Sequence, residues 1–203
     1  MKSKYLFTVL MLSCFFLFPS ILFAEDWKLE RNIDGIKVYT RATEGSEILE
    51  FKTTCEVDAS RLRVAEVVAR ITDYPNWFPE CENAQVLKSI SSTKRKIYYE
   101  IDLPWPASNR DIVMFLRVEV NNAKKTTYLY FDHTTGGKAE KDGVIRMPNA
   151  KGYWKLETAG SKTKVHYQFL ADPGGSLPTW IINLFIVDGP YDTMVALREK
   201  LKK

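Results

Sequence analysis

The sequence predicts an α+β domain in which a curved antiparallel sheet lies against a long C-terminal helix. Residues 83–171 contain no convincing helical pattern and read as consecutive short strands separated by turn-forming residues. Residues 173–203 instead place apolar side chains at helical spacing. A shorter helical pattern ends near residue 71, so one helix near each end of the chain has a sheet to pack on.

The first 24 residues are predicted to be a secretory signal peptide. Lys2 and Lys4 precede an apolar run over residues 5–18, and Ala24 offers a small residue at a cleavage site. We therefore expect a single domain over residues 25–203 that is secreted, and periplasmic if the source is a Gram-negative bacterium. An uncleaved membrane anchor is the alternative, because the third residue before the cut is a leucine.

Charge and cysteine content limit the partners. The formal net charge of the chain is +4 and no single basic run dominates it, so we expect no nucleic-acid partner. The domain is long enough to bury a sizeable core, and we expect a monomer. Cys55 and Cys81 follow the signal peptide and either pair in an oxidising compartment or stay as buried thiols.

Two strands and one helix are predicted before residue 80. The strands are Ile36–Thr40, behind an Asp-Gly turn, and Ile48–Val57, in which apolar and charged side chains alternate. A helix then runs through Ile71 with Leu62 at a core position, capped by one of the polar residues that precede it. Two prolines in residues 74–79 end this helix.

An antiparallel meander is predicted next, because strand patterns follow one another with short connections. Alternation gives each strand one apolar face and one polar face, as expected for a sheet with one side towards the core. The predicted strands are Gln85–Ile90, Lys96–Leu103, Asp111–Asn121, Thr126–His133, Gly152–Thr158 and Thr163–Leu170.

The terminal helix follows a segment that is rich in turn formers. We expect Ser176 to cap it, with Pro178 in the first turn, and basic residues gather at its C-terminal end, where the helix dipole favours them. Gly189-Pro190 interrupts the apolar pattern, since proline lacks a backbone donor and clashes with the preceding turn. The pattern is interpreted as one kinked helix.

No catalytic constellation is found. The histidines, His133 and His166, are expected to be solvated, and neither phosphate-loop nor zinc-ligand spacing occurs. Glu100 is expected on the solvent-exposed face of its strand. Arg110 and Asp111 are expected to form a structural ion pair. The alternative is a general acid–base pair, which would require a cleft that raises the pKa of the carboxylate. We expect a protein that is not an enzyme, with no cofactor and no metal.

Four spaced motifs together resemble the START (steroidogenic-acute-regulatory-related lipid transfer) domain family. They are Asp73–Pro79, Trp105–Asp111, Gly143–Arg146 with Gly152–Trp154, and Gly174–Asn183. Their order matches that of the family and the resemblance covers residues 27–203. It implies a helix-grip fold, in which the sheet wraps around the C-terminal helix and leaves an internal hydrophobic cavity, and it implies binding or transfer of a lipid, fatty acid or sterol-like molecule.

The resemblance also suggests which residues would meet the ligand. Strand parity and helical spacing place these side chains inward: Phe51, Ile97, Tyr99, Ile101, Ile112, Met114, Leu116, Tyr128, Tyr130, Trp154, Tyr167, Phe169, Ile181 and Phe185. Some sterol-binding members carry an inward charged pair on these strands, whereas the corresponding positions here are Ile97 or Tyr99 and Leu116. That difference argues against recognition of a sterol hydroxyl through an ion pair.

The family implies a gate formed by the loop before the terminal helix and the start of that helix. Trp180 is the predicted gate residue and, with Phe185, either makes transient contact with a membrane surface or packs on the sheet. Two other functions remain open. One is a polyketide cyclase/aromatase-like enzyme that uses the same cavity, and the other is an interaction module whose cavity is filled by its own side chains.

Overall fold

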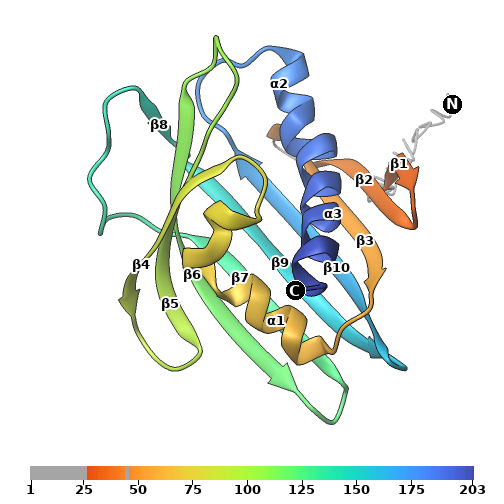
Figure 1. Cartoon of the computed structure of the whole chain (residues 1–203). Coiled ribbons are helices and arrows are strands. Elements are labelled where there is room, and N and C mark those ends of the chain that lie inside the picture. Colours follow the sequence, from red (N-terminus) through yellow and green to blue (C-terminus); the bar gives the residue numbers. More distant parts are fainter. Residues whose placement is uncertain (1–26, 44–45) are drawn as a thin grey trace, which may run out of the picture.

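A computed structural model describes residues 27–43 and 46–203. The predicted signal peptide lies outside the described residues. A ten-stranded sheet curves around the C-terminal helix (Figure 1), with the strand order β1-β2-β3-β10-β9-β7-β6-β5-β4. The predicted α+β, helix-grip architecture is confirmed.

The sheet is antiparallel along this whole path. Its strands are β1 (Lys28–Ile33), β2 (Ile36–Thr43), β3 (Ser46–Val57), β4 (Cys81–Ser89), β5 (Lys94–Ile101), β6 (Asn109–Asn121), β7 (Thr126–His133), β9 (Asn149–Ala159) and β10 (Lys162–Asp172). The short strand β8 (Val144–Arg146) pairs in parallel with the start of β6. Strands β1 and β8 were not predicted from the sequence, because neither has a sustained alternation of apolar and polar residues.

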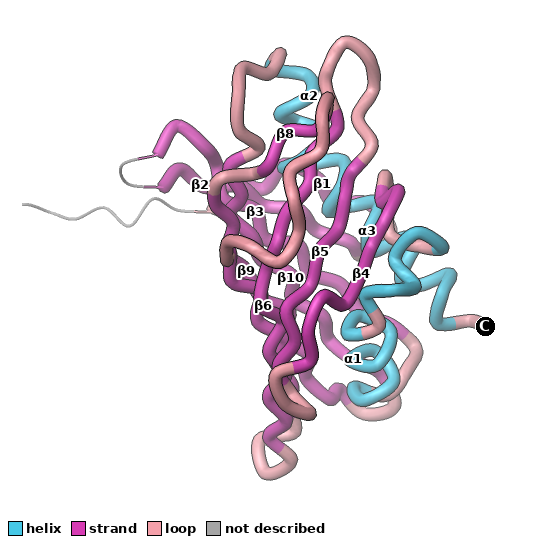
Figure 2. Tube along the Cα trace, turned by 90° about the vertical axis from the view of Figure 1, so that its left-hand side faces the viewer, coloured by secondary structure: helices cyan, strands magenta, loops and turns pink. Residues whose placement is uncertain are grey.

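The helices lie on the concave side of the sheet, as the two views of the chain show (Figures 1 and 2). Helix α1 (Arg61–Ala69) is capped by Ser60, whose hydroxyl accepts a hydrogen bond from the backbone N–H of Arg63, and the 3-10 turn η1 (Ile71–Asn76) follows it. Leu62, expected in the core, is exposed, because the buried face of this short helix is formed by Val64, Ala65, Val67 and Val68.

The C-terminal helix has three continuous parts. They are α2 (Thr179–Asn183), a π-helical turn η2 (Leu184–Asp188) and α3 (Gly189–Leu201). The expected cap at Ser176 is wrong: Pro178 occupies the capping position without a side-chain hydrogen bond. Among the described residues, no helix combines the length and the apolar character needed to cross a bilayer.

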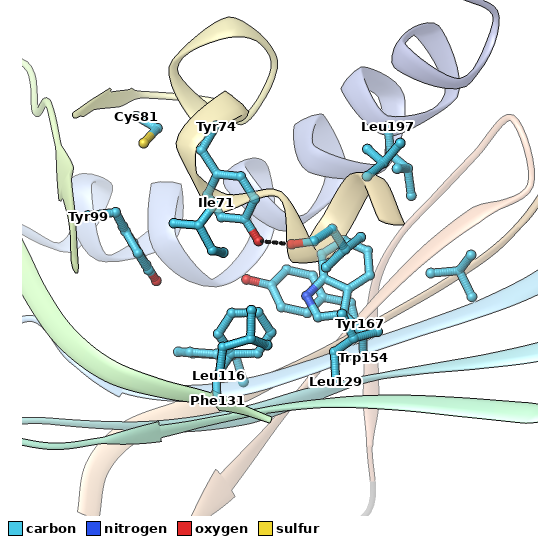
Figure 3. Close-up of a cluster of buried hydrophobic side chains, with 14 of the residues drawn as sticks. Ile71, Tyr74, Cys81, Tyr99, Leu116, Leu129, Phe131, Trp154, Tyr167 and Leu197 are labelled. Carbon is cyan, nitrogen blue, oxygen red and sulfur yellow. Dashed lines mark hydrogen bonds between the residues drawn. The ribbon is translucent and has the colours of Figure 1, made fainter. Parts of the chain in front are cut away.

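The hydrophobic core fills the end of the molecule where α1 and α3 meet the sheet. Figure 3 shows Trp154, Leu116, Leu129 and Leu197 in this cluster, and all four side chains are almost fully buried. The indole of Trp154 stacks on the ring of Tyr167 with their centroids 4.3 Å apart. This packing stabilises the end of the molecule at which α1 and α3 contact the sheet. The opposite end does not depend on this cluster.

Candidate binding cavity

A cavity of about 380 Å³ lies between the sheet and the C-terminal helix. Strands β3, β5 and β10 supply one wall, and η2 with the first turn of α3 supplies the opposite wall. The η1–β4 turn, the β5–β6 loop and Met147 complete the lining. Most lining side chains are apolar, and the volume falls within the range of roughly 300–1,000 Å³ that is typical of small-molecule sites.

Three aromatic residues on adjacent strands form the sheet wall. Phe51 on β3 is the register partner of Phe169 on β10, and the ring of Tyr167 meets that of Phe51 edge-on at 5.0 Å. Gly152 on β9 faces Phe169 from the other side, and a Cβ atom there would lie 2.0 Å from the phenylalanine ring. A glycine is therefore needed at this strand position so that Phe169 can lie across β9.

The π-helical turn shapes the helix wall. The backbone N–H of Gly189 donates to the carbonyl of Leu184, five residues back, and a Cβ on Gly189 would lie 2.8 Å from that oxygen. The wider turn places three consecutive apolar residues, Leu184–Ile186, at the cavity wall. Pro190 then lies in the first turn of α3, where proline is tolerated. The interruption predicted at Gly189-Pro190 is therefore a π turn that builds part of the cavity.

Carboxylates surround the opening of the cavity. Glu80, Asp102 and Asp192 are exposed lining residues, and Asp188 is paired with Arg31. Partial burial and the neighbouring Asp188 raise the pKa of Asp192. Among the described residues that line the cavity there is no lysine, arginine or histidine. The lining is therefore apolar inside and acidic at its edge.

Arg110 fastens the segment that leads into the helix. Its guanidinium is almost fully buried and donates to the backbone carbonyls of Pro173 and Gly174, each at 3.1 Å, and also to the carbonyl of Ser108. Asp111 is not its partner but forms a bidentate ion pair with Arg146 beside it. The expected Arg110–Asp111 pair is thus replaced by two separate attachments, one to the 173–174 loop and one to β8.

The family model of the START domain matches residues 22–203. The chain belongs to the START domain family. The resemblance carried by the four motifs is therefore confirmed, and the strands, the terminal helix and the cavity described above are those of a START domain.

Relatives support this membership. A solved STAR-related lipid transfer protein from Xanthomonas axonopodis is 32% identical, covers 87% of this chain and 99% of its own, and has a TM-score of 0.79. An uncharacterised protein of Pseudomonas aeruginosa is 33% identical over 181 residues, 89% of each chain. The mouse phosphatidylcholine transfer protein is 26% identical over 162 residues, 78% of this chain and 75% of its own.

The START cavity is lined by only part of the predicted inward set. Phe51, Tyr99, Ile101, Tyr167, Phe169 and Phe185 line it. Ile97, Ile112, Met114, Leu116, Trp154 and Ile181 are buried in the core but are not among the lining residues. Leu49 and Met147 also line the cavity but were not predicted to do so. Leu49 shares the face of Phe51, whereas Met147 lies in an irregular segment with no periodic signal.

Tyr128 and Tyr130 lie on the opposite face of the sheet, contrary to the prediction. In β7 the buried positions are Thr127, Leu129 and Phe131, so both tyrosines point outward. Their rings stack on each other at 5.4 Å, and the guanidinium of Arg117 lies over the ring of Tyr130. This apolar outer cluster made the inward face of β7 ambiguous in the sequence.

Glu100 is buried rather than solvated. The segment over residues 134–143 covers its outward-facing position, where Lys141 pairs with its carboxylate at 2.9 Å and the hydroxyl of Tyr98 donates to it at 3.1 Å.

Cys55 and Cys81 are buried free thiols, and burial raises the pKa of Cys55 to about 11 and that of Cys81 to about 12. His166 lies partly buried beside Glu157.

A second, larger groove of about 840 Å³ lies near the C-terminal end of α3, bordered by β2, β3 and β10. Many of its lining residues are charged, and several of them satisfy one another: Lys162 pairs with Asp58, and Lys202 with Glu199. Arg198 donates to the carbonyls of Asp34 and Glu56. We interpret this groove as a solvated surface valley, and the smaller apolar cavity as the binding site.

Proposed function

We propose that this protein binds one hydrophobic ligand between its sheet and its C-terminal helix and exchanges it with membranes. The apolar cavity of about 380 Å³ is the observation that carries the proposal. Each methylene moved from water into such a space gains about 0.8 kcal/mol, so an aliphatic body can be held without any ionic contact. The lipid transfer proteins among its relatives support the same function.

The proposal is for a binding protein and against a cyclase/aromatase-like enzyme. The carboxylates that line the cavity are the four at its edge, where solvent reaches Glu80, Asp102 and Asp192 and where Asp188 is paired with Arg31. Burial raises the pKa of the two phenols in the lining, Tyr99 and Tyr167, so both stay protonated and no buried general base lies among the described lining residues. General acid–base catalysis needs a group positioned within hydrogen-bond reach of a buried substrate. A hydrophobic molecule and a transient membrane surface are the proposed partners, and one chain encloses the cavity, so we propose a monomer.

We further propose that the membrane meets the end of the molecule where the β5–β6 loop and α2 lie together (Figures 1 and 2). Trp105 in that loop is 90% exposed and Trp180 in α2 is 49% exposed. Exposed tryptophans suit a membrane interface, because the indole has both an apolar body and a polar N–H. The predicted gate residue Trp180 is thus joined by a second tryptophan that the sequence analysis did not single out.

Export from the cytoplasm completes the proposal. The pattern of Lys2, Lys4 and the apolar run over residues 5–18 supports it. Fractionation of the expressing cells should recover the protein outside the cytoplasm with Glu25 as its first residue. A full-length protein in the cytoplasmic fraction would contradict export.

Native mass spectrometry of the protein purified from its own compartment tests the binding function. We expect a discrete mass excess in the lipid range, identified by extraction. Ala171→Phe fills the cavity, which Ala171 lines, and should remove that excess, whereas the adjacent Leu170→Phe should keep it, because Leu170 does not line the cavity. A ligand-free mass that persists after incubation with vesicles would refute the proposal, and a chemically altered lipid would favour an enzyme.

A further inference from the structure

Two buried tyrosines that line the cavity have hydroxyl groups without a hydrogen-bond partner among the residues that the structure describes. Four tyrosines of the described chain are buried: Tyr74, Tyr98, Tyr99 and Tyr167. The hydroxyl of Tyr74 donates to the carbonyl of Val68 at 2.9 Å, and that of Tyr98 donates to Glu100. No hydrogen bond joins the hydroxyl of Tyr99 or Tyr167 to any described residue. These two are also the two that line the cavity.

The two hydroxyls face the same space. Figure 3 shows the rings of Tyr99 and Tyr167 reaching in from different strands, with both hydroxyl oxygens on the sides of the rings that lie between the two residues, and both residues line the cavity. Tyr99 is 8% exposed and Tyr167 is 7% exposed. Burial raises the pKa of both phenols, so both remain protonated and able to donate. Their side chains are buried while the two hydroxyl oxygens keep access to the cavity space, so a ligand in the cavity can supply the hydrogen-bond partner that a native fold normally provides for such groups.

The charges around the cavity limit what can satisfy these hydroxyls. A carboxylate or phosphate placed between them would be buried without a cation, because the ionisable side chains among the described lining residues are acids or phenols. The size adds a second limit. With about 30 Å³ for each water-sized group, the cavity of about 380 Å³ holds on the order of a dozen such groups. That is enough for one chain or one compact molecule.

We propose, on the basis of the binding function proposed above, that Tyr99 and Tyr167 form a recognition subsite for one uncharged oxygen of a single-chain or compact lipid. The oxygen belongs to an alcohol or to a carbonyl group and enters first. An alcohol accepts from one phenol and donates to the other, whereas a carbonyl accepts from both. The apolar body then lies along Phe51, Phe169 and Leu184 towards the acidic opening.

Four ten-carbon probes test this subsite: decan-1-ol, decan-2-one, decanoate at pH 8 and decane. Their dissociation constants are measured for the lipid-stripped protein by displacement of a fluorescent apolar dye. Tyr99→Phe and Tyr167→Phe should each weaken the alcohol and the ketone about fivefold, the value expected for the loss of one buried neutral hydrogen bond. Decane should be unaffected, and decanoate should bind the unsubstituted protein at least a hundredfold more weakly than decanol.

Tyr128→Phe and Tyr130→Phe are the matched controls, because these tyrosines lie on the outer face of the same sheet. Both controls should bind all four probes like the unsubstituted protein. A change of less than twofold for decanol and decanone in both inner variants would overturn the subsite, as would decanoate binding as tightly as decanol. If none of the probes binds, including decane, the binding function itself fails. If decane alone binds, only the subsite fails.

Discussion

The two ends of the molecule differ in whether their tryptophan side chains are buried or exposed. At the end closed by α1, Trp154 is almost fully buried and stacks on Tyr167. At the opposite end, Trp105 is 90% exposed and Trp180 is 49% exposed. The loop beside them is held mainly by hydrogen bonds from Arg110 to its backbone carbonyls. The contrast suggests that one end supplies the stability of the fold, so that the other can expose apolar surface and move.

The largest effect is expected at the closed end. Trp154→Ala removes a large side chain from a fully packed site, so we expect the free energy of unfolding to fall by about 3–5 kcal/mol. Trp105→Ala makes the same change at the opposite end of the molecule and should alter the free energy of unfolding by less than about 0.5 kcal/mol. Urea denaturation of both variants measures the difference. Similar losses in the two variants would remove the distinction between the ends.

The attachment of the 173–174 loop by Arg110 should have an intermediate effect. Arg110→Met leaves the carbonyls of Ser108, Pro173 and Gly174 without their charged donor, so we expect a loss of stability of about 2–3 kcal/mol. Because this loop leads directly into α2, release of a bound fluorescent lipid to vesicles should also become about tenfold faster, as expected when about 1.4 kcal/mol of closure is lost.

Arg146→Met is the control that distinguishes loosening of the 173–174 loop from a general loss of stability. Arg146 forms an ion pair with the neighbouring Asp111 and donates to carbonyls of the 138–139 segment, and it makes no hydrogen bond to the loop before α2. This variant should lose stability, because Asp111 remains buried without its partner, but it should release lipid at the original rate. Equal acceleration in both variants would show that Arg110 has no specific role in closure.

Sequence reasoning succeeded where a single periodicity decided the outcome. The alternation over β3 and β6 located these strands, and the apolar spacing after residue 177 located the terminal helix. It failed where another segment covers the outer face of a strand, because alternation alone then no longer shows which residues are buried. Glu100 occupies an outward position, yet the 134–143 segment buries it.

The cavity itself is harder to predict than the strands around it. Tyr128 and Tyr130 have large aromatic rings and alternate with Leu129 and Phe131, so parity alone did not determine which face of β7 is buried. Ile97 and Met114 point inward but pack against other core residues, because the curvature of the sheet decides which inward positions border open space. Neither the curvature nor the π turn at Leu184–Asp188 leaves a periodic trace in the sequence.

The smallest change in stability, and the clearest change in function, is expected at the two exposed tryptophans. Trp105→Ser removes apolar surface that is 90% exposed and Trp180→Ser surface that is 49% exposed, so the free energy of unfolding should change by no more than about 1 kcal/mol for Trp105→Ser and by more for Trp180→Ser. If this end docks on a bilayer, each substitution removes an interfacial anchor and should slow lipid exchange with vesicles about tenfold. Fluorescence dequenching in the vesicles measures that rate.

Val120→Ser is the control for this comparison, because Val120 is also an exposed apolar residue but lies near the far end of β6, away from α2 (Figure 1). It should leave exchange unchanged, since a docking surface depends on where apolar side chains lie and not on how many are exposed. Equal slowing by Val120→Ser would mean that the protein meets membranes in no fixed orientation. The end of the molecule that carries Trp105 and Trp180 would then have no special role in exchange, and the contrast between the two ends would concern stability alone.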